Sequence, residues 1–222
     1  MRVNTIKRFD TVIFDLDGTL LDTLGDLTDS VNAALRLFDC PAVSTDDARR
    51  FIGDGYAKLI ERAIPGGTEN PHFSQCLEEF KNHYNRNMMN RTKPYPGIME
   101  LLAKLQKRGC RMAVVSNKND IAVKALTEHY FGAYIQTAVG ASAEIPRKPD
   151  PTSVFMALEE LGADKSAAVY VGDSDIDILT AKNAGMLCVS VSWGFRDVDF
   201  LLARGAAHII GEPGELPALL GG

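Results

Sequence analysis

The second half of the chain, from Gly97 onward, alternates short apolar runs with amphipathic helical stretches. The runs Met112–Val115, Ala168–Val171 and Leu187–Val191 have the length and the β-branched content of buried strands. Helical patterns separate these runs, and strands that are joined by helical crossovers pair in parallel. The sequence therefore predicts an α/β protein whose parallel sheet carries helices on both faces.

Other elements of the alternating part follow the same pattern. Tyr134–Val139 is predicted to form a strand. Pro151–Leu161 is predicted to form a helix, with Asp150 as its N-cap and Pro151 at its first position. Segments at 197–203, 208–210 and 216–220 are predicted to complete the series.

One further strand is separated from this sheet by a long insert. Thr11–Phe14 has the composition of a buried strand, and apolar residues then recur at helical spacing from residue 22 to residue 92 without a convincing strand. The proline-rich segment Lys93–Gly97 ends the insert as a stiff, non-helical connector. We expect an α/β core domain of residues 1–21 and 93–222, interrupted by an all-helical cap domain of residues 22–92.

Composition argues against several functional classes. The net charge is −5, 24% of the residues are charged, and no dense basic block is present, which argues against binding to nucleic acid or to a membrane surface. No apolar segment approaches the roughly 20 residues that a membrane span needs. The basic N-terminal sequence MRVNTIKRFD lacks the apolar region of a signal peptide. The four cysteines lie far apart without a CxxC pair, so we expect reduced thiols and a cytoplasmic location. Monomer and homodimer both remain open.

Two acids follow the first strand directly. Asp15 and Asp17 lie one residue apart, and Gly18 then allows the backbone to turn. Like charges this close raise each other's pKa unless a cation lies between them. A polar turn after a core strand is one interpretation of this pattern, and a catalytic pair with a metal ion is the other.

Polar residues are also expected at the ends of other strands. Ser116-Asn117-Lys118 follows one strand, Asp173 and Asp177 follow another, and Lys148 lies on the loop before a predicted helix. In open parallel sheets, ligands bind outside the carboxyl ends of the strands. Each residue alone fits a turn, a helix start or a solvated lysine. Their convergence at one edge of the sheet favours a binding site.

The order of these motifs resembles the haloacid dehalogenase superfamily over essentially the whole chain. The matching segments are Asp15-Leu16-Asp17-Gly18-Thr19, then Ser116-Asn117, then Lys148-Pro149, then Gly172-Asp173-Ser174 followed by Asp177. The resemblance implies a Rossmann-like core, an inserted cap and phosphoryl-transfer chemistry. Asp17 argues against carbon–halogen cleavage, because the dehalogenases lack an acid at that position.

The resemblance also implies roles for individual residues. Asp15 would attack phosphorus to form an aspartyl-phosphate, and Asp17 would protonate the leaving oxygen and later activate water. Ser116 and Lys148 would hold phosphoryl oxygens. Further contacts to the phosphate, the substrate or the nucleophile loop are expected from Gly18, Thr19 and Asn117.

A carboxylate nucleophile is repelled by an anionic phosphate ester unless a cation neutralises both. Mg²⁺ suits such an all-oxygen site. The expected metal ligands are Asp15, the backbone carbonyl of Asp17, and Asp173. Asp177 is expected to orient Lys148 or a metal-bound water.

The helical insert resembles the C1 type of cap, which closes over a small phosphorylated metabolite. Its loop Gly53-Asp54-Gly55 is predicted to face the substrate, and a plain interhelical turn is the alternative. Trp193-Gly194-Phe195-Arg196 is predicted to line the rim of the cleft, unless it is only an exposed loop. A cap lysine for phosphonatase chemistry has one candidate, Lys58, whose flanking residues do not resemble that group.

Among members of this superfamily, the chain most resembles the phosphoglycolate phosphatases, which implies a phosphoric monoester hydrolase. β-Phosphoglucomutases tend to carry an arginine on the cap loop and Glu-Asp at the start of the fourth motif, whereas this chain has Gly172-Asp173. Inorganic pyrophosphatase, sugar-phosphate phosphatase and β-phosphoglucomutase remain alternatives. A binding protein that has lost turnover is another alternative, although the complete set of motif residues favours an enzyme.

Overall fold

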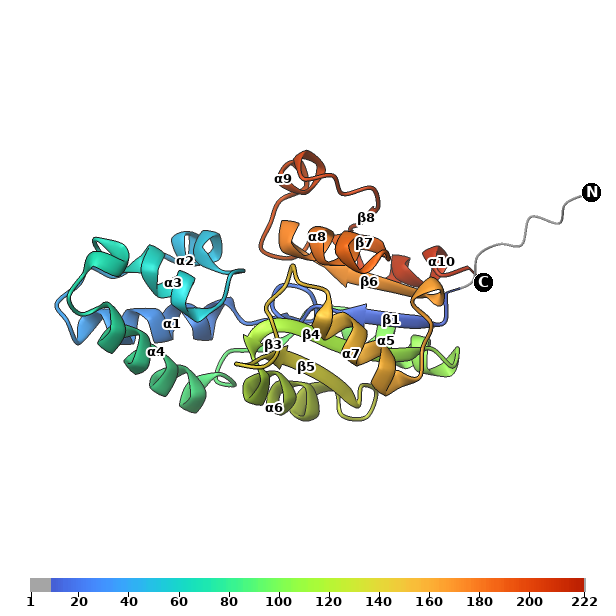
Figure 1. Ribbon diagram of the computed structural model, residues 1–222, viewed down its shortest axis with the longest axis horizontal. Coiled ribbons are helices and arrows are strands. Elements are labelled where there is room, and N and C mark those ends of the chain that lie inside the picture. The colour runs from blue at the N-terminus through green and yellow to red at the C-terminus, as the bar shows by residue number, and fades with distance from the viewer. Residues whose placement is uncertain (1–8, 222) are drawn as a thin grey trace, which may run out of the picture. The chain divides into compact units, whose positions relative to one another are not determined.

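The structure is a computed structural model that describes residues 9–221 (Figure 1). The basic segment at residues 1–8, which enters the prediction about a signal peptide, lies outside the described residues. The chain divides into two compact units. Residues up to Leu20 together with those from Pro94 form the core unit, and Leu21–Lys93 form the helical unit.

The core unit is built on a six-stranded sheet with the order β5-β4-β1-β6-β7-β8. All of the paired strands run parallel. The strands are β1 (Thr11–Phe14), β4 (Arg111–Asn119), β5 (Thr137–Ala141), β6 (Ala168–Gly172), β7 (Leu187–Val191) and β8 (Ile209–Ile210). The prediction of an α/β protein with a parallel, Rossmann-like sheet is confirmed.

Helices cover both faces of this sheet. The helices of the core unit are α5 (Ile98–Lys107), α6 (Asp120–Phe131), α7 (Thr152–Leu161), α8 (Asp175–Ala184), α9 (Val198–Ala203) and α10 (Leu216–Leu219). Ile13 and Tyr170 pack with residues of α7 and α8 in one buried cluster. Val12 and Phe14 point to the opposite face, because side chains alternate along a strand. Both are at most 1% exposed, so that face is covered as well.

Several predicted boundaries in the core unit differ from the structure, most of them by a single residue. β4 continues through Asn119 and does not end at Val115. The strand predicted at Tyr134–Val139 is displaced toward the C-terminus, since β5 runs from Thr137 to Ala141.

The third difference concerns the predicted helix Pro151–Leu161. Pro151 occupies the N-cap position, and the helix begins at Thr152. Asp150 still caps the first turn, because its carboxylate accepts a hydrogen bond from the Thr152 N–H at 2.9 Å. Proline has no N–H of its own, so the first available donor lies one residue later.

The helical unit consists of α1 (Leu24–Arg36), α2 (Thr45–Phe51), α3 (Tyr56–Ala63), a short 3-10 turn η1 (Gly67–Glu69) and α4 (Phe73–Asn87). A two-stranded sheet pairs β2 (Leu21–Asp22) with β3 (Lys93–Pro94), the segments at which the chain enters and leaves this unit. Among the described residues, no helix is both long enough and apolar enough to cross a membrane.

One buried acid of the helical unit holds its exit segment. Asp26 on α1 is 2% exposed, and its carboxylate accepts hydrogen bonds from the Arg91 N–H, the Thr92 N–H and the Thr92 hydroxyl at 2.8–3.0 Å. Three donors satisfy a buried carboxylate well. This contact ties the start of α1 to the residues just before β3.

Candidate active site

Asp15 is held at the carboxyl end of β1. Its backbone N–H donates to the Val171 carbonyl at 2.8 Å, so the neighbouring strand β6 fixes its position. The residue is 7% exposed. Burial and, less strongly, the charge of the nearby Asp177 raise the pKa of Asp15 to about 7, although Lys148 opposes the shift. An acid of this kind, buried but facing a cation, is typical of a functional site.

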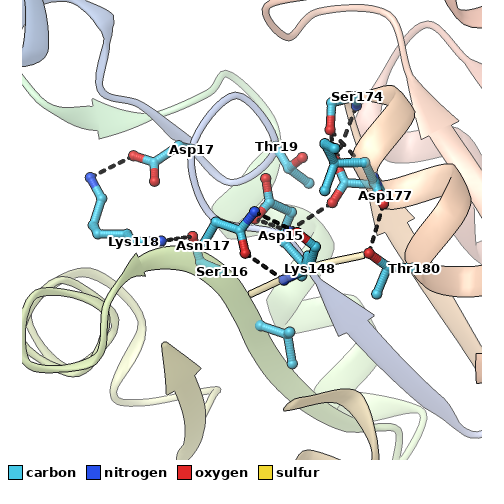
Figure 2. Close-up of polar contacts among 12 residues, drawn as sticks. Asp15, Asp17, Thr19, Ser116, Asn117, Lys118, Lys148, Ser174, Asp177 and Thr180 are labelled. Carbon is cyan, nitrogen blue, oxygen red and sulfur yellow. Dashed lines mark hydrogen bonds and ion pairs between the residues drawn. The ribbon is translucent and has the colours of Figure 1, made fainter. Parts of the chain in front are cut away.

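Lys148 joins two of the predicted acids. Its Nζ lies 2.7 Å from Asp15 Oδ1, 2.7 Å from Asp177 Oδ1 and 3.0 Å from the Tyr170 hydroxyl, and Figure 2 shows the two acids meeting at this lysine. Burial disfavours the charged ammonium, but Asp15 and Asp177 together raise the pKa of Lys148 well above its usual range. The lysine is therefore a fixed positive charge within the site.

Asn117 positions Lys148 through the main chain. Its side-chain amide donates to the Lys148 carbonyl at 3.1 Å, and its side-chain oxygen accepts from the Lys148 N–H at 2.6 Å. Because Asn117 lies on β4, this pair of bonds attaches the loop that contains Lys148 to that strand. The sequence predicted a contact to substrate or to the nucleophile loop for Asn117, and the structure places its side chain on the lysine loop.

Three buried acids gather beside this lysine. Asp15, Asp173 and Asp177 each offer a carboxylate oxygen, and these oxygens all lie within 4.8 Å of one another. Burial raises the pKa of Asp173 well above its usual range, and the charges of Asp177 and Asp15 add to this effect. Mutual repulsion of buried carboxylates is relieved by a cation that binds them.

The donors and the charge of the site fit a divalent cation. Carboxylate oxygens are the ligands that Mg²⁺ and Ca²⁺ prefer. The acids in and beside the cluster are Asp15, Asp17, Asp173 and Asp177, and the lysines paired with them are Lys118 and Lys148. Four carboxylates against two ammonium groups leave two formal negative charges, which one divalent cation would balance.

Asp177 uses both of its oxygens within the protein. Oδ1 accepts from Lys148, while Oδ2 accepts from the Ser174 hydroxyl at 2.6 Å and from the Ser174 N–H at 3.0 Å. The Ser174 contacts form a capping box at the start of α8. The side chain is fully buried, so the helix start holds it rigidly against the lysine. Contact with Lys148 is one of the two positions that the sequence predicted for Asp177.

Asp17 lies with a lysine that the sequence analysis left without a role. Lys118 Nζ is 2.7 Å from Asp17 Oδ1, and the two side chains are 2% and 13% exposed (Figure 2). The acidic cluster uses the carboxylate of Asp177 and not that of Asp17, for which the sequence had proposed only the backbone carbonyl as a ligand. The sequence prediction ended this strand at Val115 and so placed Lys118 after it. In the structure β4 continues through Asn119, and Lys118 lies within the strand.

The turn after Asp17 is closely packed against Asp173. Gly18 has φ 87°, and a side chain there would overlap the Asp173 carboxylate. The Thr19 hydroxyl donates to Asp173 Oδ1 at 3.3 Å. The Ser116 hydroxyl, which is 5% exposed, accepts from the Lys118 N–H at 3.3 Å. The structure thus brings Gly18, Thr19 and Ser116 to the same edge of the sheet as Asp15.

The segment after β7 contacts this turn and the acidic cluster. The Trp193 indole N–H donates to the Thr19 carbonyl at 3.0 Å, and the Phe195 N–H donates to Asp173 Oδ2 at 2.7 Å. Gly194 lies so close to Asp173 and to the Gly18 carbonyl that a Cβ would overlap both. The segment therefore supports Asp173, and its position at the rim of a cleft stays a prediction.

The predicted cap-loop residues lie in the other unit. Gly53 and Gly55 have φ 131° and 86°, and Gly55 is the N-cap of α3. The Asp54 carboxylate pairs with Arg62 on that helix. These contacts belong to the helical unit, so the facing of this loop toward a substrate stays a prediction.

Comparison with known proteins identifies the family. A family model described as "Haloacid dehalogenase-like hydrolase" matches residues 12–191. A phosphoglycolate phosphatase of Mesorhizobium japonicum is 36% identical over 190 residues, which are 84% of this chain and 84% of that protein. A phosphoglycolate phosphatase of Aquifex aeolicus is 33% identical over 199 residues, which are 87% of this chain and 92% of that protein.

A solved structure agrees with these relatives. A crystal structure from Lactobacillus delbrueckii subsp. bulgaricus superposes with a TM-score of 0.91 and 34% identity, covering 97% of this chain and 100% of that one. The family model spans most of the chain, and its residues include all of the acids and lysines gathered at the sheet edge. The chain belongs to the haloacid dehalogenase-like hydrolase family.

Proposed function

We propose that the protein is a Mg²⁺-dependent phosphatase that hydrolyses a small phosphorylated metabolite, with phosphoglycolate as the preferred substrate. The observation that carries the proposal is the position of Lys148, whose Nζ lies 2.7 Å from both Asp15 and Asp177 beside a third buried acid, Asp173. A buried carboxylate, a fixed cation and a cluster of acids that fits a divalent cation thus lie at one edge of the sheet. The name phosphoglycolate phosphatase, carried by relatives 33–36% identical to this chain, supports the choice of substrate.

Asp15 is the proposed nucleophile. Its carboxylate would attack phosphorus while the bond from phosphorus to the ester oxygen breaks, which leaves the phosphoryl group on Asp15. Ser116 and Lys148 would bind the phosphoryl oxygens, and Asp177 would keep Lys148 in place. Mg²⁺ held by Asp15 and Asp173, with the Asp17 backbone carbonyl, would supply the positive charge that an anionic ester needs next to a carboxylate.

Asp17 is the proposed proton carrier. In the first step its carboxyl group would donate a proton to the departing ester oxygen. In the second step its carboxylate would take a proton from the water that attacks the phosphorylated Asp15, and inorganic phosphate would be released. One side chain then serves both steps, and its proton is returned at the end of each cycle.

The test is a comparison of kcat/KM across phosphoglycolate, sugar phosphates, pyrophosphate and p-nitrophenyl phosphate with Mg²⁺, and again after chelation with EDTA. Phosphoglycolate is expected to give the highest value, and EDTA is expected to abolish turnover until Mg²⁺ is restored. Asp15→Asn should lower kcat by at least about 10³-fold, which corresponds to roughly 4 kcal/mol in the barrier. Asp10→Asn is the matched control. Asp10 lies just before β1, at the end of the strand opposite Asp15, and pairs there with Arg111.

Each result has a distinct meaning. Appreciable turnover by Asp15→Asn with unchanged circular dichroism would refute the nucleophile assignment. Turnover that persists after thorough chelation would refute the metal requirement. A higher kcat/KM for pyrophosphate or for a sugar phosphate would replace the substrate while leaving the reaction class in place.

A further inference from the structure

The site contains two buried lysines with different surroundings. Lys148 lies between two acids and the Tyr170 hydroxyl. Lys118 forms its ion pair with Asp17, and its side chain is only 2% exposed. A buried ammonium is costly unless its surroundings compensate the charge, so a second one in a small site calls for a role of its own.

Lys118 lies beside Asp17, the proposed proton carrier. In the proposed reaction Asp17 donates a proton to the leaving oxygen, so that oxygen must come within about 2.6–3.2 Å of the Asp17 carboxyl group. Lys118 Nζ lies 2.7 Å from that same carboxyl group. The ammonium and the leaving oxygen would therefore contact the same carboxyl group. Lys148, by contrast, contacts the nucleophile itself, at Asp15.

Figure 2 shows the same division, because the Lys118 and Asp17 pair lies apart from the group formed by Asp15, Lys148 and Asp177. One lysine thus serves the attacking side of the ester and the other serves the departing side. A cation on the departing side attracts a leaving group that carries its own negative charge.

We propose that Lys118 is a specificity-determining residue that binds an anionic group on the leaving alcohol. The proposal rests on the proposed function. Lys118 would favour phosphomonoesters that carry a carboxylate on the carbon bonded to the ester oxygen. In these molecules the carboxylate carbon lies two covalent bonds from the ester oxygen. In such a molecule the carboxylate and the ester oxygen lie close enough for Lys118 to bind the first while Asp17 protonates the second. Arg is the natural substitute, since its guanidinium also binds carboxylates.

A matched pair of substrates tests this role. Phosphoglycolate and ethyl phosphate share the phosphoryl group, the ester oxygen and a two-carbon leaving group, but only the first carries a carboxylate. The wild-type ratio of kcat/KM for phosphoglycolate over ethyl phosphate should fall at least about 30-fold in Lys118→Met. Most of this fall should come from KM for phosphoglycolate. Lys118→Arg should retain a large part of the ratio.

Two controls isolate the effect. Lys124→Met removes an exposed lysine of α6 that pairs with Asp120, and it should leave the ratio unchanged. The ratio within one preparation does not depend on the fraction of folded protein, so partial misfolding of a variant cannot produce the result. If Lys118→Met yields no folded protein, Lys118→Gln takes its place, with the same expected fall.

A binding measurement separates recognition from proton transfer. The measurement uses the Asp15→Asn background, which is expected not to turn over. Calorimetric titration should show that Lys118→Met lowers the affinity for phosphoglycolate at least about 30-fold and the affinity for ethyl phosphate by less than about threefold. An equal loss for both esters, in rate or in affinity, would overturn the proposal and leave Lys118 with the sole task of orienting Asp17. If the wild type hydrolyses neither these esters nor any other phosphomonoester, the proposed function itself fails.

Discussion

Buried aspartates in the two units of this protein have opposite surroundings. Asp26 in the helical unit and Asp173 in the core unit are both 2% exposed. Asp26 receives three hydrogen bonds from Arg91 and Thr92, at 2.8–3.0 Å. Asp173 receives bonds from the Phe195 N–H at 2.7 Å and the Thr19 hydroxyl at 3.3 Å, and it faces two other acids.

Burial by itself therefore does not mark a functional acid. Around Asp26 the chain supplies enough donors to satisfy the carboxylate, so the acid stabilises the fold. Around Asp173 the chain places Asp15 and Asp177, whose charges raise its pKa in addition to the effect of burial. A cation bound by the three acids would relieve this unfavourable arrangement.

The largest expected effect in this comparison is on the stability of the helical unit. Asp26→Ala removes the acceptor of three donors, two of them main-chain groups, and should lower the free energy of unfolding by about 3–4 kcal/mol. Asp29→Ala on the same helix removes an exposed ion pair with Arg91 and should cost about 0.5 kcal/mol or less. Urea unfolding followed by circular dichroism measures both. Equal losses for the two variants would contradict the structural role of Asp26.

The second prediction concerns the acids of the core unit and pH. The pKa of Asp15 is about 7 in the folded chain against an ordinary 3.8. Between these values the folded protein holds a proton that the unfolded chain has released. The stabilising contribution of this group is therefore complete below about pH 4 and is lost as the pH rises through about 7. Metal-free protein should accordingly melt at a lower temperature at pH 8 than at pH 5.5.

Mg²⁺ should reverse this loss at pH 8, because the metal binds the ionised carboxylates. At a Mg²⁺ concentration of a hundred times the Kd, binding would add about 2.7 kcal/mol to the free energy of unfolding. The increment should be smaller at pH 5.5, where protons compete, and absent in Asp173→Asn. Differential scanning fluorimetry with and without Mg²⁺ measures it. An increment that survives Asp173→Asn would show that the metal binds elsewhere.

The smallest of the three effects tests the support of Asp173 by the segment after β7. Gly194→Ala would place a Cβ against Asp173 and the Gly18 carbonyl, and the main chain at Gly18 cannot move without shifting Asp17. We expect Mg²⁺ affinity to fall about 10–100-fold, or roughly 1.4–2.7 kcal/mol. Gly214→Ala is the control, since no atom lies within 4 Å of a Cβ built there. Calorimetric titration with Mg²⁺ that gave equal affinities for the two variants would refute the supporting role.

The sequence was sufficient to predict where the polar residues lie along the chain. Apolar runs and the acids that follow them depend on neighbouring positions only, and strand order then brings Asp15, Ser116 and Asp173 to one edge. The same reasoning failed for boundaries. β4 was predicted to end at Val115, but the strand continues to Asn119, because the polar side chains of Ser116, Asn117 and Lys118 are buried there and have partners.

The sequence could not predict which side chains would pair. Lys148 and Asp15 are 133 positions apart, and Tyr170 joins them from a different strand. The pairing of Lys118 with Asp17 was also not predicted, since a lysine after Ser116-Asn117 is equally typical of a solvated turn. Phe195 contacts Asp173 through its backbone N–H, a group that nearly every residue has, so the residue type does not indicate this contact.

The sequence by itself determined the α/β class, the order of the motifs and the family to which they belong, because these depend on local patterns of apolar and polar residues. Only the tertiary structure decided that each acid of the first motif has its own lysine, that Asp177 belongs to the acidic cluster, and that the segment after β7 supports Asp173. These relations depend on packing between segments far apart in the chain. Side-chain distances of a few ångströms are fixed by that packing and not by spacing along the sequence.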